Sequence, residues 1–566
     1  MQVNDDKLNP IAPKTESLGT RIKRNLPTFA LLILIMAVAG YLRFVGIDWD
    51  DNTHPHPDER FLTMVETGIS IPLSIGEYFD TEFSPLNPKN SGFNFFVYGT
   101  FPIILVRYIA ERISETGYDQ VHIVGRMASA SFDLISVFLV YMIGANLYRK
   151  RVGLLAAAFA ALSVLSIQLA HFFVVDPFAN TFILLGIYFA IRSSKVGRWW
   201  NYLLFGVSLG LATASKANAA PLALVLVIAV GIRIWRADDL SRWQTSIRGI
   251  LGLVLGAVVS LIVFRLFQPY AFEGPTFFGI LPNEQFFSNL VEVSRQQSGA
   301  ADFPPALQWA MRIPVIFSLK NMVVWGLGFP LGLVSWIGFG WALYRIFRYR
   351  ELEHSFLVFW AGGNFLWRSI GFTQTMRYQM PVYPTIVILG AWALWRVWEI
   401  VSDDLPSRKQ TISKVLSGGS IALVVTTTAV WAFSFVNIYQ EPNTQVDASR
   451  WIYQNLPGSF NLIVQDAGEE FFEPSSLPSN SALVPGIGGG LDLVFKPNVW
   501  GQLNSIQLSI ADDSPGMGED FIISFSLFDD LSASSLVSST HFEGQITSGN
   551  LEIGFNTGTP VELSSG

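Results

Sequence analysis

The sequence predicts an α-helical, multi-pass membrane protein with a small β-rich domain at its C-terminal end. Three observations support this fold class. Half of the 566 residues are hydrophobic and only 14% are charged, whereas soluble domains usually have about 25% charged residues. Long apolar stretches recur between residues 26 and 436. After residue 440 the chain changes to short alternating runs between Gly, Ser and Pro clusters, a pattern that is typical of strands.

The apolar stretches are each close to the roughly 20 residues that a helix needs to cross the hydrocarbon core, some only with flanking residues counted. The first stretch, residues 26–45, follows Arg21, Lys23 and Arg24. No small-residue cleavage site follows it, so we interpret it as a transmembrane helix rather than a signal peptide. The other stretches are residues 124–148, 152–169, 178–191, 219–234, 250–267, 323–347, 356–372, 381–397 and 415–436.

The distribution of Lys and Arg predicts the topology, because short cytoplasmic loops are enriched in these residues. Basic clusters occur at residues 149–151, 192–198, 233–248, 345–350 and 408–414. If all of them are cytoplasmic, an even number of crossings separates consecutive clusters. Residues 93–109 must then lie at the membrane surface or re-enter it without crossing. We therefore expect about eleven transmembrane helices in the plasma membrane, with residues 1–25 cytoplasmic and the C-terminus external.

This topology brings polar residues from distant parts of the chain to the external face. The first external loop, residues 46–92, contains the adjacent acids Asp58 and Glu59 between His56 and Arg60. The same face receives Asp176, Lys216, Arg377, Tyr378 and a second external loop, residues 268–312. Acids beside a bilayer are costly and usually mark a site. We therefore expect an active site here, in an external cavity that is lined by Asp58, Asp176 and Arg377 and opens sideways to the bilayer.

Several of these residues also have a purely structural interpretation. Asp176 precedes Pro177 and would then cap a helix. Lys216 would extend to the lipid headgroups, and Arg377 would be an anchor. Under the same interpretation the Asp58-Glu59 pair is a solvated loop. We expect His122 and His171 to be satisfied polar groups at helix ends rather than ligands.

The composition excludes several classes of cofactor and partner. The chain has no cysteine, which excludes disulfides and thiolate-ligated metals. His54 and His56 beside Asp58 are a weak metal signal without a further His or Cys nearby, so we assign no metal ligand and leave a divalent cation open. No basic footprint for nucleic acid is present, and no Walker-type loop indicates nucleotide hydrolysis.

Residues 440–566 are predicted to form a separate external domain. It contains 16 Asp and Glu residues, and its only Lys or Arg residues are Arg450 and Lys496. We expect a short helix at residues 447–455 and then a β-sandwich-like fold. The predicted strands are residues 460–464, 505–509, 521–528 and 551–555. A spacer, docking or sugar-binding role is open for this domain.

Six segments of the membrane domain, residues 26–439, resemble the GT-C glycosyltransferases of family 39, the protein O-mannosyltransferases and their bacterial relatives. They occur in the order of that family. They are His56-Pro-Asp-Glu-Arg60, Phe96-Val-Tyr-Gly-Thr-Phe-Pro102, Gly125-Arg126, Gln168-Leu-Ala-His-Phe-Phe-Val-Val-Asp176, Ala214-Ser-Lys216 and Arg377-Tyr-Gln-Met-Pro-Val-Tyr-Pro384. The resemblance implies the family's eleven-helix fold and does not extend to the C-terminal domain.

The resemblance also implies an activity. Such enzymes transfer a hexose or pentose from a polyprenyl-phosphate donor to a hydroxyl of a glycan, lipid or protein on the outer face, with inversion. It assigns Asp58 as the general base, with a pKa that Glu59 should raise. Glu59 would orient the donor or acceptor and hold Asp58.

The resemblance assigns the remaining site residues by charge. Lys216, Arg377 and Arg126 would bind the donor phosphate. Asp176 would contact the sugar or a cation. Further candidates are His56, Arg60, His171 and Tyr378.

Two other classes of function remain open. A transporter or lipid-linked-sugar flippase would also place charged groups in the membrane, but such proteins often have matched inverted halves, which are not evident here. A non-catalytic membrane scaffold is the second alternative, in which Asp58 is merely exposed.

Overall fold

The computed structural model describes residues 18–301, 303–403, 407–455, 460–466, 468–474, 501–510, 520–528, 535–545, 549–555 and 561–563. The chain divides into two compact units, Met1–Glu441 and Pro442–Gly566. Each unit is described by itself.

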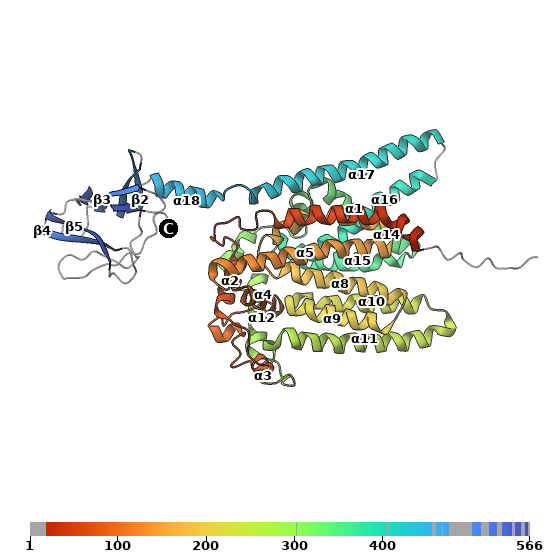
Figure 1. Ribbon diagram of the computed structural model, residues 1–566. Coiled ribbons are helices and arrows are strands. Elements are labelled where there is room, and N and C mark those ends of the chain that lie inside the picture. Colours follow the sequence, from red (N-terminus) through yellow and green to blue (C-terminus); the bar gives the residue numbers. More distant parts are fainter. Residues whose placement is uncertain are drawn as a thin grey trace, which may run out of the picture. The chain divides into compact units, whose positions relative to one another are not determined.

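The first unit is helical, and its long helices lie side by side along a common direction (Figure 1). These helices contain the apolar stretches of the sequence, and the apolar side chains form one large buried core. The helices are α1 (Leu18–Phe44), α5 (Tyr118–Leu147), α6 (Lys150–Ala161), α7 (Val164–Ala170), α8 (Asp176–Lys195), α9 (Trp199–Ser215), α10 (Ala223–Trp235), α11 (Asp239–Phe267), α13 (Ile316–Asn321), α14 (Phe329–Tyr349), α15 (Ser355–Ile370), α16 (Tyr383–Asp403) and α17 (Ser407–Val436).

Six helices in the described part of the chain are long and apolar enough to cross a membrane. A seventh span results if α6 and α7, which meet at a bend of 57°, are taken together. The multi-pass helical architecture predicted from composition is therefore confirmed. The number eleven stays a prediction.

Short elements gather at one end of the helices (Figure 1). They include α2 (Pro57–Gly68), α3 (Ile75–Phe79), α4 (Thr100–Ile113) and α12 (Glu284–Ser298). With 14 residues, α4 extends only about 21 Å, which is less than the roughly 30 Å of a hydrocarbon core. That this segment does not cross the membrane stays a prediction. The apolar faces of α2 and α4 share a second core with Phe173 and Phe178, and this packing fixes α2 against α5 and α8.

The basic loops lie at the other ends of these helices, where they form their own polar contacts. Arg149 pairs with Glu399, and Arg236 pairs with Glu353 at 3.0 Å. The Tyr148 hydroxyl is 2.8 Å from Nδ1 of His354. The helical unit therefore has two polar ends, one rich in basic loops and one that contains α2.

The second unit is β-rich, as the sequence predicts. The helix α18 (Thr444–Asn455) precedes the strands β1 (Phe460–Asp466), β2 (Glu469–Pro474), β3 (Gly501–Ile510), β4 (Asp520–Phe528), β5 (Leu536–Gln545), β6 (Gly549–Gly554) and β7 (Val561–Leu563). The first sheet has the order β2-β1-β3-β6, with β7 also pairing with β3, and β4 and β5 form a second sheet. All pairings are antiparallel. Apolar side chains of both sheets share one core, as in a sandwich.

Candidate active site

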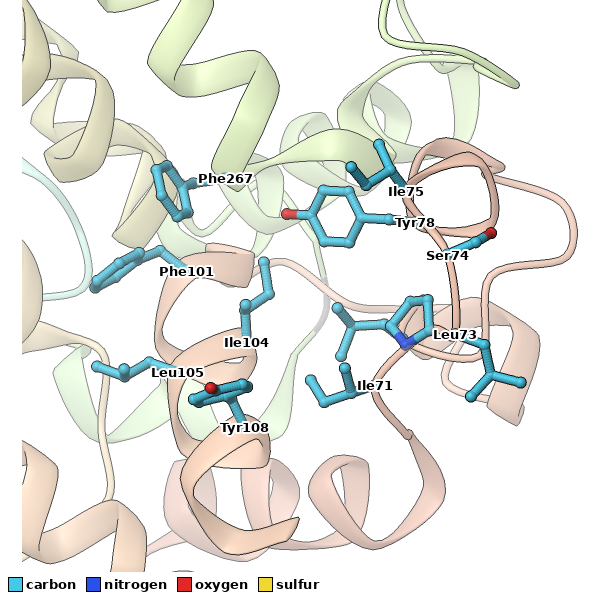
Figure 2. A pocket seen from close by; sticks show the side chains of 12 residues that line it. Ile71, Leu73, Ser74, Ile75, Tyr78, Phe101, Ile104, Leu105, Tyr108 and Phe267 are labelled. Atoms are coloured by element: carbon cyan, nitrogen blue, oxygen red, sulfur yellow. The ribbon is translucent and has the colours of Figure 1, made fainter. Parts of the chain in front are cut away.

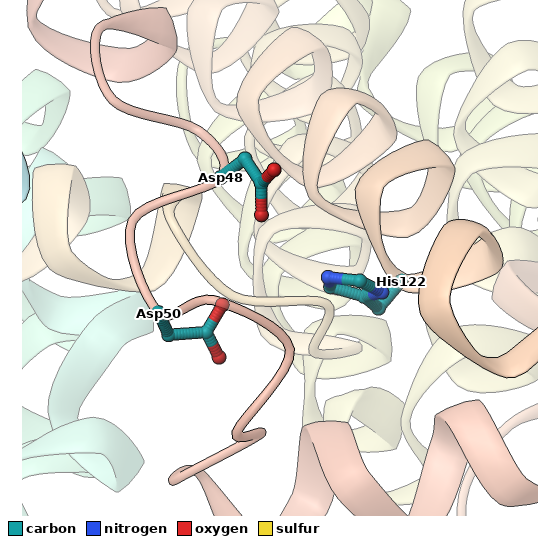
Figure 3. A group of neighbouring side chains, drawn as sticks. All are labelled: Asp48, Asp50 and His122. Carbon is teal, nitrogen blue, oxygen red and sulfur yellow. The ribbon is translucent and has the colours of Figure 1, made fainter. Parts of the chain in front are cut away.

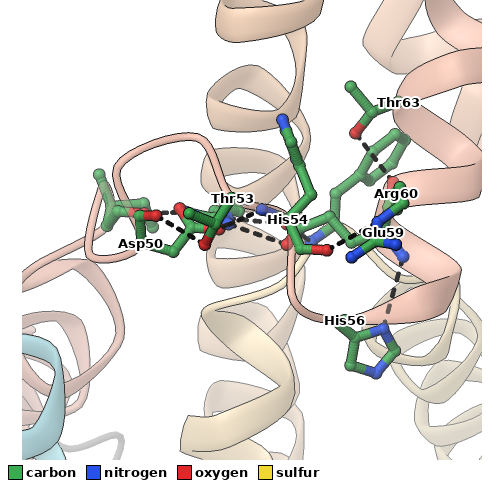
Figure 4. Close-up of polar contacts among 10 residues, drawn as sticks. Asp50, Thr53, His54, His56, Glu59, Arg60 and Thr63 are labelled. Atoms are coloured by element: carbon green, nitrogen blue, oxygen red, sulfur yellow. Dashed lines mark hydrogen bonds and ion pairs between the residues drawn. The ribbon is translucent and has the colours of Figure 1, made fainter. Parts of the chain in front are cut away.

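The helix α2 begins at Pro57 and carries the adjacent acids in its first turn, where Figure 4 shows Glu59 beside His56 and Arg60. His56 is its N-cap, and the His56 Nδ1 accepts a hydrogen bond from the backbone N–H of Glu59 at 3.4 Å. Pro57 is the first helical residue, a position that suits its fixed φ. Carboxylates in the first turn are stabilised by the helix dipole. The local sequence therefore explains why a helix starts here, but the roles of Asp58 and Glu59 depend on what each one meets.

Asp58 contacts a residue that lies much later in the sequence of the membrane domain. Its Oδ2 accepts a hydrogen bond from the Arg377 guanidinium at 2.6 Å. The two side chains remain 18% and 21% exposed, which leaves room for a ligand to approach. A second neighbour is Tyr98, whose hydroxyl lies close enough to the Asp58 carboxylate to interact with it. The segment before α4 and the segment before α16 thus both reach the first residues of α2.

A second acid–base pair joins two further segments. The Lys216 Nζ lies 2.7 Å from the Asp176 carboxylate. Asp176 is the first residue of α8, whose N-cap is Val175, so the alternative in which Asp176 caps the helix is wrong. Lys216 follows the last residue of α9, and its contact with Asp176 does not support the headgroup interpretation.

The two pairs act on each other electrostatically. Asp176 stabilises the charge of Arg377, and Lys216 stabilises that of Asp58. Tyr378 lies between the cations, with its ring centroid 5.4 Å from Lys216 Nζ and 5.6 Å from the Arg368 guanidinium. Four segments that are far apart in the sequence therefore form one charged group, which we call the Asp58 site.

The Asp58 site has an excess of positive charge. Arg368 is close enough for Asp176 to act on its charge. Arg377, Lys216 and Arg368 together outnumber the carboxylates Asp58 and Asp176 by one. This excess favours a singly charged anion.

The pKa of Asp58 differs from our expectation. Burial raises the pKa of this carboxyl, but Arg377, His56 and Lys216 together outweigh burial and hold it below its ordinary value. The expected raised pKa is therefore wrong. The physical reason is that Glu59 has a cation of its own, so the charges that dominate around Asp58 are positive.

Glu59 belongs to a fully buried cluster with Arg126 and Asp50. The Nε and Nη2 atoms of Arg126 donate to the two carboxylate oxygens of Glu59 at 2.7 and 2.8 Å. Nη1 and Nη2 donate to Asp50 at 2.9 Å each, and Nη1 also donates to the Ile47 carbonyl at 2.9 Å. The three side chains of this Arg126 cluster have no exposed surface.

This arrangement corrects two assignments. A guanidinium has five N–H donors, and the contacts of Arg126 use all five. Arg126 therefore has no N–H left to donate to the phosphate of a sugar donor. Glu59 is likewise inaccessible to donor or acceptor, and its Oε1 also accepts from the backbone N–H of Phe173 at 2.8 Å. Glu59 therefore attaches α2 to α5 and to the segment before α8, and in this way holds the neighbouring Asp58 in place.

The remaining candidates separate into one site neighbour and two structural residues. His56 lies close enough to Asp58 and Arg377 to act on both charges. Arg60 is exposed, and its Nε donates to the His54 carbonyl at 3.1 Å. His171 is buried, with its ring nitrogens 2.8 and 2.9 Å from the carbonyls of Ile167 and Val45, as expected of a satisfied polar group.

An apolar hollow of about 410 Å³ lies beside the first half of α4 (Figure 2). Its lining comes from residues 71–78, α4 and the end of α11 and includes Ile71, Tyr78, Phe101, Ile104 and Phe267. Asp58, Asp176 and Arg377 are not among the lining residues, so this hollow is not the expected cavity.

Two residues of the Asp58 site were missed by the sequence analysis. Tyr98 lies within the segment 96–102, which was noted only as part of the family pattern. Arg368 is a cation in the last turn of the apolar helix α15, and that unusual position was the available signal.

Comparisons with known proteins give one family match and several similar solved structures. A family model described as dolichyl-phosphate-mannose-protein mannosyltransferase matches residues 104–268. No curated protein sequence matches the chain significantly.

Three solved structures are similar to this chain at low identity. The oligosaccharyltransferase of Archaeoglobus fulgidus in the apo form is 15% identical over 78% of this chain and 59% of that one, with a TM-score of 0.48. ArnT from Cupriavidus metallidurans bound to undecaprenyl phosphate is 16% identical over 72% of this chain and 75% of that one, with a TM-score of 0.43. The Saccharomyces cerevisiae protein O-mannosyltransferase complex Pmt1–Pmt2 bound to the sugar donor is 16% identical over 44% and 35%, with a TM-score of 0.33.

The chain spans less than two thirds of the length of the archaeal enzyme. The family match lies within the membrane domain that first suggested the resemblance. The match to the mannosyltransferase family model therefore confirms the resemblance to the protein O-mannosyltransferases over residues 104–268 of this multi-pass membrane protein.

Proposed function

We propose that this chain is a membrane glycosyltransferase that moves one sugar from a polyprenyl-phosphate donor to a hydroxyl acceptor at the external face. One observation is central to the proposal. The pairs Asp58–Arg377 and Asp176–Lys216 come from four distant segments and meet in one partly exposed group. Charges that were needed only for folding would be expected to be buried, as they are in the Arg126 cluster.

The donor fits the charge of the Asp58 site. A polyprenyl-phosphate sugar is a phosphodiester with one negative charge, and the site has one excess positive charge. Arg377 is the phosphate ligand in this proposal, because a guanidinium can form paired hydrogen bonds to phosphate oxygens. Lys216 supplies a second cation for the charge that grows on the leaving phosphate.

Asp58 is the general base. Its lowered pKa keeps it ionised at neutral pH. When the donor phosphate engages Arg377, the Asp58 carboxylate loses its strongest partner and becomes more basic. It can then accept the proton of the acceptor hydroxyl, as a positioned carboxylate does in general-base catalysis.

The reaction is a single displacement. The acceptor oxygen forms a bond to the anomeric carbon while the bond from that carbon to the phosphate oxygen breaks, and the lipid phosphate keeps the electron pair. The proton goes to Asp58. One displacement inverts the anomeric configuration, and a phosphate leaving group needs no separate acid.

The test uses the purified full-length protein in lipid nanodiscs with a panel of radiolabelled polyprenyl-phosphate sugars and hydroxyl acceptors. We expect one donor to yield a labelled product of inverted configuration together with free polyprenyl phosphate. Reconstituted vesicles provide the contrasting assay. Movement of the labelled lipid across the vesicle membrane without a new glycosidic bond would instead support a flippase.

A further inference from the structure

Two buried histidines beside the Arg126 cluster have side chains without hydrogen bonds of good geometry. His54 is 1% exposed and His122 is fully buried, and no ring nitrogen of either residue is satisfied. Only the backbone of Tyr118 acts on His122 as a weak acceptor. The two rings are 4.4 Å apart between centroids. Buried polar groups are normally bonded, so two unpartnered imidazoles side by side indicate a missing partner.

Two aspartates of the first external loop point toward the same space. Figure 3 shows Asp48, Asp50 and His122 directed toward one another, and one ligand atom from each lies within 4.8 Å of the other two. His54, Asp50 and Glu59 meet the same criterion. Asp50 is common to both groups and the two imidazole rings are neighbours, so Asp48, Asp50, His54 and His122 belong to two overlapping groups.

The charges here favour a dication. Asp50 and Glu59 together outweigh Arg126 by one negative charge within a fully buried cluster. The neighbouring Asp48 adds a second negative charge. A doubly charged cation balances both, and without such a cation the buried excess is costly.

We propose that Asp48, Asp50, His54 and His122 bind a divalent transition metal ion of the zinc type. Two imidazole nitrogens and two carboxylate oxygens are ligands that Zn²⁺ accepts in tetrahedral sites. Mg²⁺ and Ca²⁺ prefer oxygen ligands, so the two imidazoles argue against these ions. Around Zn²⁺, neighbouring ligand atoms lie about 3.3–3.6 Å apart, so the loop contracts slightly on binding. Asp48 is exposed and provides the path by which the ion enters.

The metal acts on the loop and not on the substrate. Asp51, Asn52 and His54 all have positive φ, between 45° and 60°, a conformation that non-glycine residues rarely adopt. Bonds from Asp48, Asp50 and His54 to an ion shared with α5 would stabilise this loop. Asp50 also contacts Arg126, which holds Glu59 beside Asp58. The ion is therefore a positioning element for the start of α2.

The test measures metal content directly. The full-length protein is purified with an affinity tag that contains no histidine, stripped with a chelator, incubated with Zn²⁺ and dialysed. Inductively coupled plasma mass spectrometry should find about one Zn²⁺ per chain in the wild type. Substitution by Co²⁺ should give the intense visible absorption of a tetrahedral site. Loss of a ligand should weaken binding by about tenfold or more.

Matched variants separate this site from adventitious binding. His54→Gln and His122→Gln should each lose the ion, while His541→Gln, which changes an exposed histidine of the second unit, should retain it. Asp48→Asn alters an exposed ligand and should fold normally with weakened binding. The proposal is overturned if the folded wild type retains no metal after dialysis. It is also overturned if Asp48→Asn and His541→Gln bind Zn²⁺ and Co²⁺ identically to the wild type.

Discussion

The Asp58 site and the Arg126 cluster both begin at the first turn of α2, yet they differ in nearly every physical property. In the Asp58 site the ion pair remains about one-fifth exposed, positive charge is in excess, and the segments that meet are loop ends. In the Arg126 cluster the side chains are fully buried, negative charge is in excess, and every donor of the guanidinium is used. Adjacent residues on a helix point about 100° apart, so neighbours in the sequence can enter different environments.

The comparison shows how burial separates two uses of the same residue types. A partly exposed ion pair can exchange its partner for a ligand at modest cost. A fully buried one cannot, because an uncompensated buried charge is expensive. Acid pairs in a sequence are therefore weak evidence that both members act on a substrate.

The largest effect is expected for Asp58→Asn. This change keeps the size of the side chain but removes its ability to accept a proton, and loss of a general base costs about 10²–10⁴-fold in rate. We expect normal folding and near-normal donor binding with greatly reduced kcat in the glycosyl transfer assay. Full transferase activity of this variant would remove Asp58 from the mechanism.

A substitution in the Arg126 cluster should lower the free energy of unfolding. Arg126→Leu leaves two buried carboxylates unpaired, and breaking a buried pair typically costs about 3–5 kcal/mol. The measurement is the free energy of unfolding in mild denaturant. The matched control is Arg60→Leu, which removes the exposed arginine directly after Glu59 and should cost less than about 1 kcal/mol. Equal stability of the two variants would contradict the structural role of the cluster.

Arg377→Ala should weaken donor use. Loss of a hydrogen bond to a charged group costs about 1.5–3 kcal/mol, or roughly ten- to a hundred-fold in kcat/KM. Lys150→Ala provides the control, because this exposed lysine lies at the basic end, where its Nζ donates to the Asn25 side chain at 2.6 Å. Small and similar changes in both variants would show that Arg377 does not bind the donor.

The pH dependence of kcat/KM tests the charge environment of the Asp58 site. Because the pKa of Asp58 lies below its ordinary value, the active ionised form persists above that pKa and is lost only as the pH falls through it. The acid limb of kcat/KM should therefore lie below about pH 4. In Arg377→Gln the effect of burial is less opposed, and the limb should move upward. An acid limb near neutrality in the wild type would contradict this assignment.

The smallest effect is expected for Tyr98→Phe, which removes one of several partners of Asp58. We expect a loss of about 1 kcal/mol, or roughly fivefold in kcat, with an acid limb shifted toward higher pH. Tyr108→Phe, at an exposed tyrosine of α4, serves as the control. An unchanged pH profile in Tyr98→Phe would show that the hydroxyl does not stabilise the Asp58 carboxylate.

The sequence by itself determined the helical membrane architecture, the β-rich second unit and the candidates Asp58, Asp176, Lys216 and Arg377. Hydrophobic stretches and charge bias are local properties, so they can be read without knowing which helices meet. The same reasoning predicts that residues 93–109 do not cross the membrane, which stays a prediction.

Only the tertiary structure decided which charges pair. Asp58 and Arg377 are 319 residues apart, and Lys216 and Asp176 are 40 apart, so no local pattern specifies these contacts. The burial of Glu59 and Arg126, the contact from Tyr98 and the unpartnered histidines beside Asp50 likewise arise from packing among distant helices. Burial and the sign of the nearest charge control a carboxylate's pKa and accessibility, and both are properties of the folded neighbourhood.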